Sequence, residues 1–206
     1  MIILHSTDVV KKILHQNNFN NFEIKIKGRI SKCAYNKEKT IIYICPEDNN
    51  DSANSLIVAA HEASHALNYR EGVTNPSLLK FLEKAHKTIF IATLLIIPTL
   101  FFLELFNILQ FPKTFIWSLI YLNGFFTILF QIYYTRDEAK TEKRAIIELQ
   151  NIWSDGELDK NIFKINKKTL IWSIYTVTIL VVPALVLAPY GLYFLLNLFL
   201  NLKGSL

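Results

Sequence analysis

Three long apolar stretches constrain this 206-residue chain more than any other feature of its sequence: residues 88–110, 114–134 and 169–202. A helix needs about 20 apolar residues to cross the hydrocarbon core of a bilayer, which is about 30 Å thick. The first two stretches reach that length, and an ordinary globular core does not require three of them. With 51% apolar and only 19% charged residues, the chain is also too hydrophobic for a disordered protein. We therefore expect a multi-pass protein of the cell membrane with a soluble N-terminal part.

The positive charges of the chain lie at the ends of these stretches. Only Lys113 lies between the first stretch and the second. Because Lys and Arg accumulate in cytoplasmic loops, the N-terminal part and residues 135–168 are predicted to face the cytoplasm. The net charge of +5 is thus a topology signal, and we expect no nucleic acid partner. The charges before the first stretch, after the second and before the third are Lys80, Lys84, Lys87, Arg136, Lys140, Lys143, Arg144, Lys160, Lys164, Lys167 and Lys168.

The soluble part has the pattern of a small α+β unit. Ser6 precedes apolar residues at helical spacing, which predicts an N-capped amphipathic helix that ends near residues 16–21. Residues 22–27 alternate apolar and polar side chains, residues 39–45 are rich in β-branched ones, and residues 36–38 can form a turn. These segments predict a small β-sheet. Ser52 or Asn54 can cap the helix that follows, which is expected to stop near Gly72.

That last helix contains the sequence His61-Glu62-Ala63-Ser64-His65, which fits the pattern H-E-x-x-H. In this pattern two imidazoles one helical turn apart face the same side and can both bind zinc. Zinc lowers the pKa of a water molecule towards about 7, and the glutamate between the histidines can take its proton. We therefore predict His61 and His65 as metal ligands and Glu62 as the catalytic general base.

A catalytic zinc site needs a third protein ligand, and the segment after the second apolar stretch offers one. Glu138 and Glu142 are predicted to share a helix face with the apolar residues Ala145, Leu149 and Ile152. Two carboxylates in line with an apolar stripe are costly unless something pairs with them. We interpret Glu138 as the third ligand and Glu142 as the acceptor of a hydrogen bond from a ligand histidine. The alternative is a solvated helix start with Glu138 near the helix N-terminus.

The predicted membrane topology is compatible with this ligand set. The two apolar stretches between His65 and Glu138 return the chain to the side of the membrane from which it started. Glu138 would then emerge within about one helical turn of the membrane surface.

Taken in order, these features resemble a known family, the bacterial membrane-bound neutral zinc metallopeptidases, and more distantly the gluzincin heat-shock membrane proteases. The likeness runs from Ser6 to about Ala145 and includes the amphipathic helix, the strand pair, the histidine motif, two spans and a Glu-x-x-x-acid motif. The resemblance implies that zinc is the cofactor, that His61, His65 and Glu138 bind it, and that Glu62 is the general base. Two positions depart from the family pattern. Ser64 replaces a glycine, and Glu142 stands where related gluzincins often have aspartate.

The predicted fold class is an α+β membrane protein. It combines a small cytoplasmic β-sheet and a zincin-type HExxH helix with a transmembrane helical hairpin and a C-terminal membrane segment. The expected parts are a soluble half-domain (1–87), the hairpin (88–134), a cytoplasmic helix with the third ligand (135–168) and the C-terminal segment (169–206). Because residues 189–191 read Pro-Tyr-Gly, we expect this last segment to break into one span and a re-entrant or interfacial helix.

The predicted function is a membrane-anchored zinc endopeptidase that cleaves peptide or protein substrates at the cytoplasmic surface of the lipid bilayer. An intramembrane protease is disfavoured, because polar residues flank the HExxH helix on both sides and leave too short an apolar run to span. The other alternative is a catalytically silent membrane scaffold or regulator that keeps a structural zinc site. The departures at Ser64 and Glu142 are its support.

Overall fold

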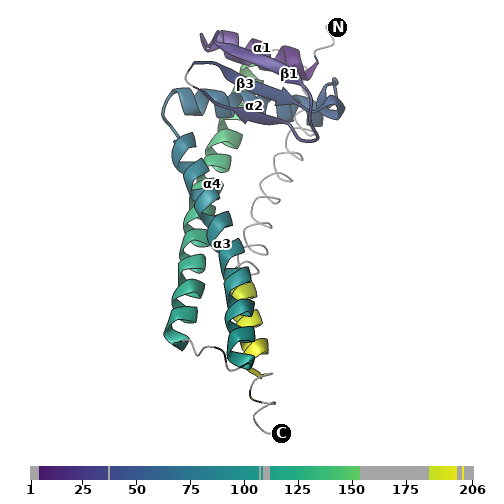
Figure 1. Cartoon of the computed structure of the whole chain (residues 1–206). Coiled ribbons are helices and arrows are strands. Elements are labelled where there is room, and N and C mark those ends of the chain that lie inside the picture. The colour runs from purple at the N-terminus through teal and green to yellow at the C-terminus, as the bar shows by residue number, and fades with distance from the viewer. Residues whose placement is uncertain are drawn as a thin grey trace. The chain divides into compact units, whose positions relative to one another are not determined.

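The computed structural model describes residues 5–36, 38–106, 108, 112–153, 186–198 and 201 of the chain. The described residues form two compact units (Figure 1). The first unit contains residues 5–76 and 136–153, and the second contains residues 77–135 and 186–198.

The first unit is built on a small mixed sheet of strands β1 (Phe22–Ile26), β2 (Lys32–Ala34) and β3 (Thr40–Ile44). The strand order is β1-β3-β2, with β1 parallel and β2 antiparallel to the central strand β3. Phe22 pairs with Thr40 and Ile26 with Ile44, while Lys32 pairs with Tyr43. The predicted sheet is therefore present, and the sequence reading missed only the short strand β2.

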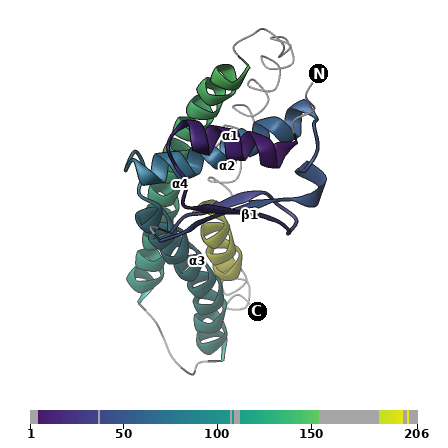
Figure 2. The same cartoon turned by 90° about the horizontal axis from the view of Figure 1, so that it is seen from above.

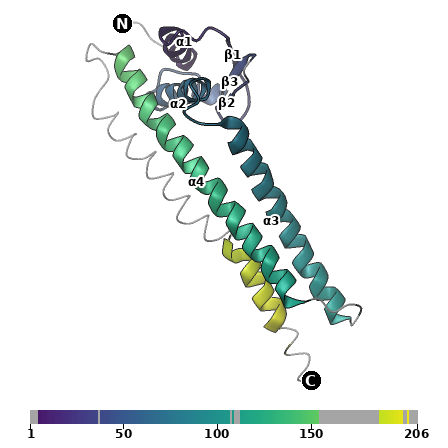
Figure 3. The same cartoon turned by 90° about the vertical axis from the view of Figure 1, so that its left-hand side faces the viewer.

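Helices α1 (Ser6–Gln16) and α2 (Ala53–Arg70) pack together on one side of this sheet (Figures 2 and 3). A short 3-10 helix, η1 (Pro46–Asp48), leads from β3 towards α2. The alternating pattern of β3 directs the fully buried Ile42 and Ile44 into the core between sheet and helices. The other buried apolar residues of this core are Val9, Val10, Ile13, Leu14, Phe19, Leu56, Ala59, Ala60, Ala63, Ala66, Leu67, Ala145, Leu149 and Ile152.

The last three of these residues belong to helix α4 (Lys113–Ile152), which contributes residues to both units. The core that buries α2 also buries Ala145, Leu149 and Ile152. This agrees with the prediction that these three residues share one helix face. This packing places the carboxylates one to two turns earlier on α4 beside the HExxH helix.

Two helix starts differ from the sequence prediction. His5, not Ser6, is the N-cap of α1, because the Ser6 hydroxyl donates instead to the main-chain carbonyls of Asp48 and Asn50. In addition, no new helix opens after residue 134. Helix α4 continues to Ile152, since residues 135–152 contain neither proline nor glycine and are rich in strong helix formers.

In the second unit, helix α3 (Pro76–Leu105) runs beside residues 113–135 of α4 in the opposite direction (Figures 1 and 3). Both helices are long and apolar enough to cross a membrane. The buried His86 and Thr127 form a hydrogen bond of 3.0 Å between them. Helix α3 begins at Pro76, well before the predicted apolar stretch.

A shorter apolar helix, Val186–Leu198, also belongs to the second unit. It continues through Pro189 and Gly191, so the predicted break at these residues is wrong. Trp117 of α4 packs against Tyr190 and Tyr193, and these contacts hold the helix on both sides of Gly191. The other predictions for residues 154–185, including the polar connection and the start of the C-terminal segment, lie outside the described residues.

Candidate metal centre

The HExxH motif lies in the middle of helix α2, whose sequence favours an uninterrupted helix. The side chain of Ser52 caps the first turn by accepting a hydrogen bond from the main-chain N–H of Ser55 at 3.3 Å. Neither proline nor glycine occurs between Ala53 and Arg70. Residues four apart lie on one helix face, and the His61 and His65 ring centroids are accordingly 4.7 Å apart.

Glu138 of α4 faces both imidazoles. Its Oε2 lies 3.2 Å from Nε2 of His61, and its Oε1 lies 3.7 Å from Nε2 of His65. One potential ligand atom from each of the three residues lies within 4.8 Å of the other two. The structure therefore brings together the three residues that the sequence predicts as metal ligands.

The Nδ1 atoms of the two histidines face other residues of α4. Nδ1 of His61 lies 3.5 Å from Oε2 of Glu142, which places Glu142 where the sequence predicts a partner for a ligand histidine. Nδ1 of His65 lies 3.1 Å from Oγ1 of Thr141 and 3.5 Å from Oδ2 of Asp137. Both rings thus direct Nε2 towards Glu138 and Nδ1 towards supporting oxygen atoms.

Glu62 is buried beside strand β2, and its carboxylate accepts a hydrogen bond from the main-chain N–H of Cys33. Burial raises the pKa of Glu62 to about 7, although the neighbouring His61 and the Cys33 N–H oppose the rise. A carboxyl with a pKa near neutral can both take and release a proton, as a general base in peptide hydrolysis must. Cys33 and Cys45 are both free thiols.

The two imidazoles have opposite pKa shifts. Burial alone would lower the pKa of His61, but the carboxylates of Glu138 and Glu142 beside its two ring nitrogens outweigh burial and raise the pKa to about 10. Burial and the charge of His61 lower the pKa of His65 to about 4. One protonated ring among several buried carboxylates indicates a site with excess negative charge.

The donor set fits zinc. Two imidazole nitrogens and one carboxylate oxygen are the ligands of many catalytic zinc sites. Within the described part of the chain, Nδ1 of His61, Oδ1 of Asp137 and Oε2 of Glu142 are buried without a geometrically satisfactory hydrogen bond. Buried acidic groups of this kind are costly unless a cation balances them. A divalent cation between His61, His65 and Glu138 would supply that balance.

Three residues beside the candidate ligands were not assigned a role from the sequence: Tyr69, Asp137 and Thr141. The Tyr69 hydroxyl donates to Oδ2 of Asp137 at 2.8 Å, and its ring stacks on His65 with centroids 5.4 Å apart. Burial and the charge of Asp137 raise the pKa of Tyr69, so the phenol stays protonated as a donor. Spacing contained a signal for Tyr69, because it follows His65 by one helical turn. Asp137 and Thr141 share a face of α4, but spacing alone does not assign them to His65.

Comparison with known proteins agrees with this geometry. The chain matches the model of a family described as "Putative neutral zinc metallopeptidase" over residues 3–192. The chain belongs to this zinc metallopeptidase family. The matched range contains every residue of the centre, and the family resemblance expected from the sequence is confirmed. No curated protein and no solved structure matches the chain.

Proposed function

We propose that this member of the zinc metallopeptidase family is a membrane-anchored endopeptidase that hydrolyses peptide bonds at the cytoplasmic membrane surface. The observation that carries the proposal is the convergence of His61, His65 and Glu138 within 4.8 Å, with Glu62 buried beside them. A scattered set of histidines and acids would support no such chemistry.

In this proposal His61, His65 and Glu138 hold the zinc ion through Nε2, Nε2 and a carboxylate oxygen. Zinc, when bound, supplies Lewis-acid polarisation of water and of the scissile carbonyl. Glu62 takes the proton of the attacking water and delivers it to the leaving amine. Glu142, whose Oε2 lies 3.5 Å from Nδ1 of His61, would accept a hydrogen bond from that ring and keep Nε2 available for the metal.

Membrane anchoring is supported by the composition of helices α3 and α4 and by the placement of charges. Each helix contains an apolar window long enough to span, and Lys113 is the only Lys or Arg between their apolar stretches. The positive-inside bias then favours a cytoplasmic first unit and a centre on the cytoplasmic side. Glu138 follows the second apolar stretch almost directly in the sequence, which favours a zinc site close to the lipid headgroups.

Substrates that fit this arrangement are unfolded peptide or protein segments near the membrane. Strand β2 is an edge of the sheet, and the N–H of its residue Cys33 is bonded to Glu62. An extended peptide can pair with such an edge through main-chain hydrogen bonds that depend little on its sequence. We therefore propose broad specificity, with folded soluble proteins resistant and with no nucleic acid partner.

The test combines zinc content with peptidase activity of the purified full chain. The wild-type protein should carry about one zinc per chain, because three protein ligands on two ordered helices form a catalytic type of site. Glu62→Gln should keep the zinc and lower kcat by about 100-fold or more, since the general base is lost. His65→Ala and Glu138→Ala should lose both zinc and activity. Glu47→Gln, which changes an exposed carboxylate of the first unit, is the matched control.

Two results would contradict parts of this proposal. A wild-type protein that holds zinc but cleaves no unfolded substrate would favour the catalytically silent scaffold. If Glu138→Ala kept full metal while Glu142→Ala or Asp137→Ala lost it, the ligand assignment would be wrong.

A further inference from the structure

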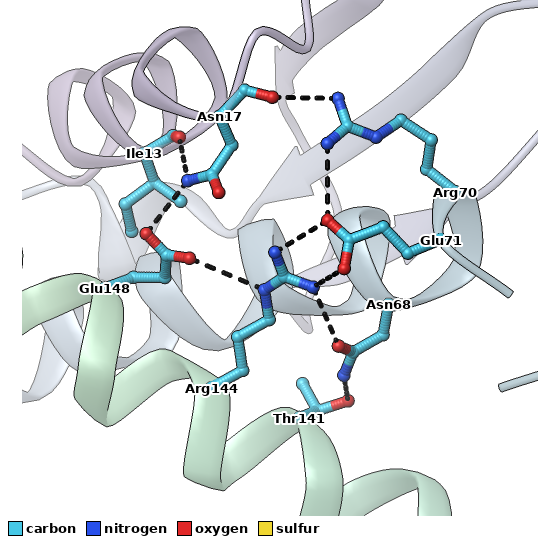
Figure 4. Close-up of polar contacts among 8 residues, drawn as sticks. All are labelled: Ile13, Asn17, Asn68, Arg70, Glu71, Thr141, Arg144 and Glu148. Atoms are coloured by element: carbon cyan, nitrogen blue, oxygen red, sulfur yellow. Dashed lines mark hydrogen bonds and ion pairs between the residues drawn. The ribbon is translucent and has the colours of Figure 1, made fainter. Parts of the chain in front are cut away.

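A chain of polar contacts leads from the surface of the first unit to the second histidine of the motif. We name its members, Glu71, Arg144, Asn68 and Thr141, the Arg144 relay (Figure 4). Arg144 of α4 pairs with both carboxylate oxygens of Glu71, at 2.5 and 2.8 Å, and donates to Oδ1 of Asn68 at 3.2 Å. Nδ2 of Asn68 then donates to Oγ1 of Thr141 at 3.2 Å.

The chemistry of Arg144 determines which atoms of the Arg144 relay donate hydrogen bonds and which accept them. A guanidinium group has only donors, so Asn68 must present its oxygen to Arg144 and its amide nitrogen to Thr141. Asn68 and Thr141 are buried, so water has little access to their polar atoms. One lone pair of the Thr141 oxygen is therefore occupied by the Asn68 N–H, and the second remains available as an acceptor.

Nδ1 of His65 lies where it can use that second lone pair. Oγ1 of Thr141 is its nearer acceptor, at 3.1 Å, whereas Oδ2 of Asp137 is 3.5 Å away and already accepts the Tyr69 hydroxyl at 2.8 Å. An N–H on Nδ1 leaves Nε2 as the unprotonated nitrogen, and Nε2 is the atom that faces Glu138. With the Thr141 hydroxyl as the acceptor of the His65 Nδ1–H, the relay supports the tautomer that can bind a metal ion.

We propose that Thr141, oriented by Asn68 and Arg144, is a positioning residue that fixes the ring of His65 with Nε2 ready for the metal. This inference rests on the proposed function, because it assigns His65 to zinc. The relay also joins the two helices that carry the ligands, since Asn68 and Glu71 belong to the end of α2 or follow it directly, and Arg144 and Thr141 belong to α4. A hydrogen-bond partner of a ligand histidine typically changes metal affinity by about 10- to 100-fold.

Two substitutions at Thr141 distinguish the effect of its hydrogen bond on the His65 ring from the effect of its side-chain packing. Thr141→Val keeps the size of the side chain but removes the acceptor, while Thr141→Ser keeps the acceptor and removes the methyl group. The measurement is the zinc Kd of the full chain, obtained by competition with a chromophoric chelator, with folding monitored by circular dichroism. We expect Thr141→Val to raise the zinc Kd by about 10-fold or more and Thr141→Ser to stay close to the wild type. The reverse order, or two unchanged values, would overturn the proposal.

Asn68→Ala provides a second, independent test of the Arg144 relay by the same zinc Kd measurement. It leaves the Thr141 hydroxyl in place but removes the group that orients it, so the zinc Kd should rise less than in Thr141→Val. The double variant should bind zinc no more weakly than Thr141→Val alone, because both changes interrupt one relay. Additive losses would mean that Asn68 acts elsewhere, and they would overturn the relay.

Nitrogen-15 chemical shifts of the His65 ring report which ring nitrogen carries the proton, and a change in packing alone would not alter them. In the zinc-free wild type Nδ1 should carry the proton, and in zinc-free Thr141→Val the two tautomers should mix. A wild-type chain that takes up no zinc would overturn the proposed function and this inference together. A wild type that binds zinc as tightly as Thr141→Val would overturn this inference alone.

Discussion

The hydroxyl of Ser64, at the position where the family pattern has glycine, is fully buried in α2 and has no hydrogen-bond partner among the described residues. A buried hydroxyl without a partner costs roughly 1–3 kcal/mol, and alanine also has a higher helix propensity than serine. We therefore expect Ser64→Ala to stabilise the protein by about 1 kcal/mol. A rise of a few degrees in thermal unfolding, followed by circular dichroism, would check this.

Ser64→Gly is the matched comparison, because it restores the residue of the family pattern. Glycine inside a helix costs about 1 kcal/mol relative to alanine, so this variant should be less stable than Ser64→Ala. A destabilised Ser64→Ala would mean that the hydroxyl makes a stabilising contact. If both variants also keep zinc and activity, Ser64 gives no support to a catalytically silent scaffold.

Helical spacing in the sequence was enough to predict which residues of the candidate centre lie together. His61 and His65 are one turn apart, and Glu138 and Glu142 share a face with the apolar residues that bury α4. Thr141 and Asp137 could not be assigned in the same way. A threonine or aspartate on a helix has many possible partners, and only the packing of α4 against α2 selects His65 for these two.

At the scale of elements, the ion pair between Glu71 and Arg144 links the end of α2 to α4. Hydrogen bonds from Arg144 lower the pKa of Glu71 below its ordinary value. A carboxyl whose folded pKa is lowered stabilises the fold above its unfolded pKa of about 4.3 and loses this contribution as the pH falls through the folded value. Because Glu71 is partly exposed, the contribution should not exceed about 1 kcal/mol.

Glu71→Gln should therefore be less stable than the wild type at pH 7. The difference should shrink as the pH falls below about 4.3 and should vanish only below the lowered folded pKa of Glu71. Thermal unfolding at several pH values measures this difference. Glu83→Gln is the control, since Glu83 and Lys87 form an exposed pair within one helix. A stability gap for Glu71→Gln that stayed constant down to low pH would show that the charge of Glu71 is not the cause.

Elements with strong local signals were predicted, and those that depend on tertiary contacts were not. The cap at Ser52 and strands β1 and β3 follow from side-chain type and alternation. Strand β2 has only three residues and two exposed side chains, so its assignment depends on pairing with β3. Ser6 has the side chain of an N-cap, yet its hydroxyl bonds to carbonyls more than forty residues away, which no local pattern can reveal.

At the scale of the whole molecule, we propose that the two candidate spans influence which substrates reach the candidate metal centre. Helices α3 and α4 are each long and apolar enough to cross a membrane. Two crossings return the chain to its starting side, so the HExxH helix and Glu138 can share one compartment. An active centre with this connectivity would encounter chains held at the membrane far more often than chains in solution.

We therefore expect the reconstituted enzyme to cleave an unfolded sequence faster when it is tethered to a membrane helix than when it is free at the same bulk concentration. Tethering raises the effective concentration of the cleavable segment near the centre without any new contact. Initial cleavage rates in proteoliposomes, compared for the two forms of one sequence, measure the effect. Glu62→Gln gives the background rate, and a cysteine probe placed at Lys113 reports the orientation of the protein in the bilayer. Equal rates for both forms would exclude selection of substrates by membrane placement. Cleavage of both forms would still support the proposed peptidase activity.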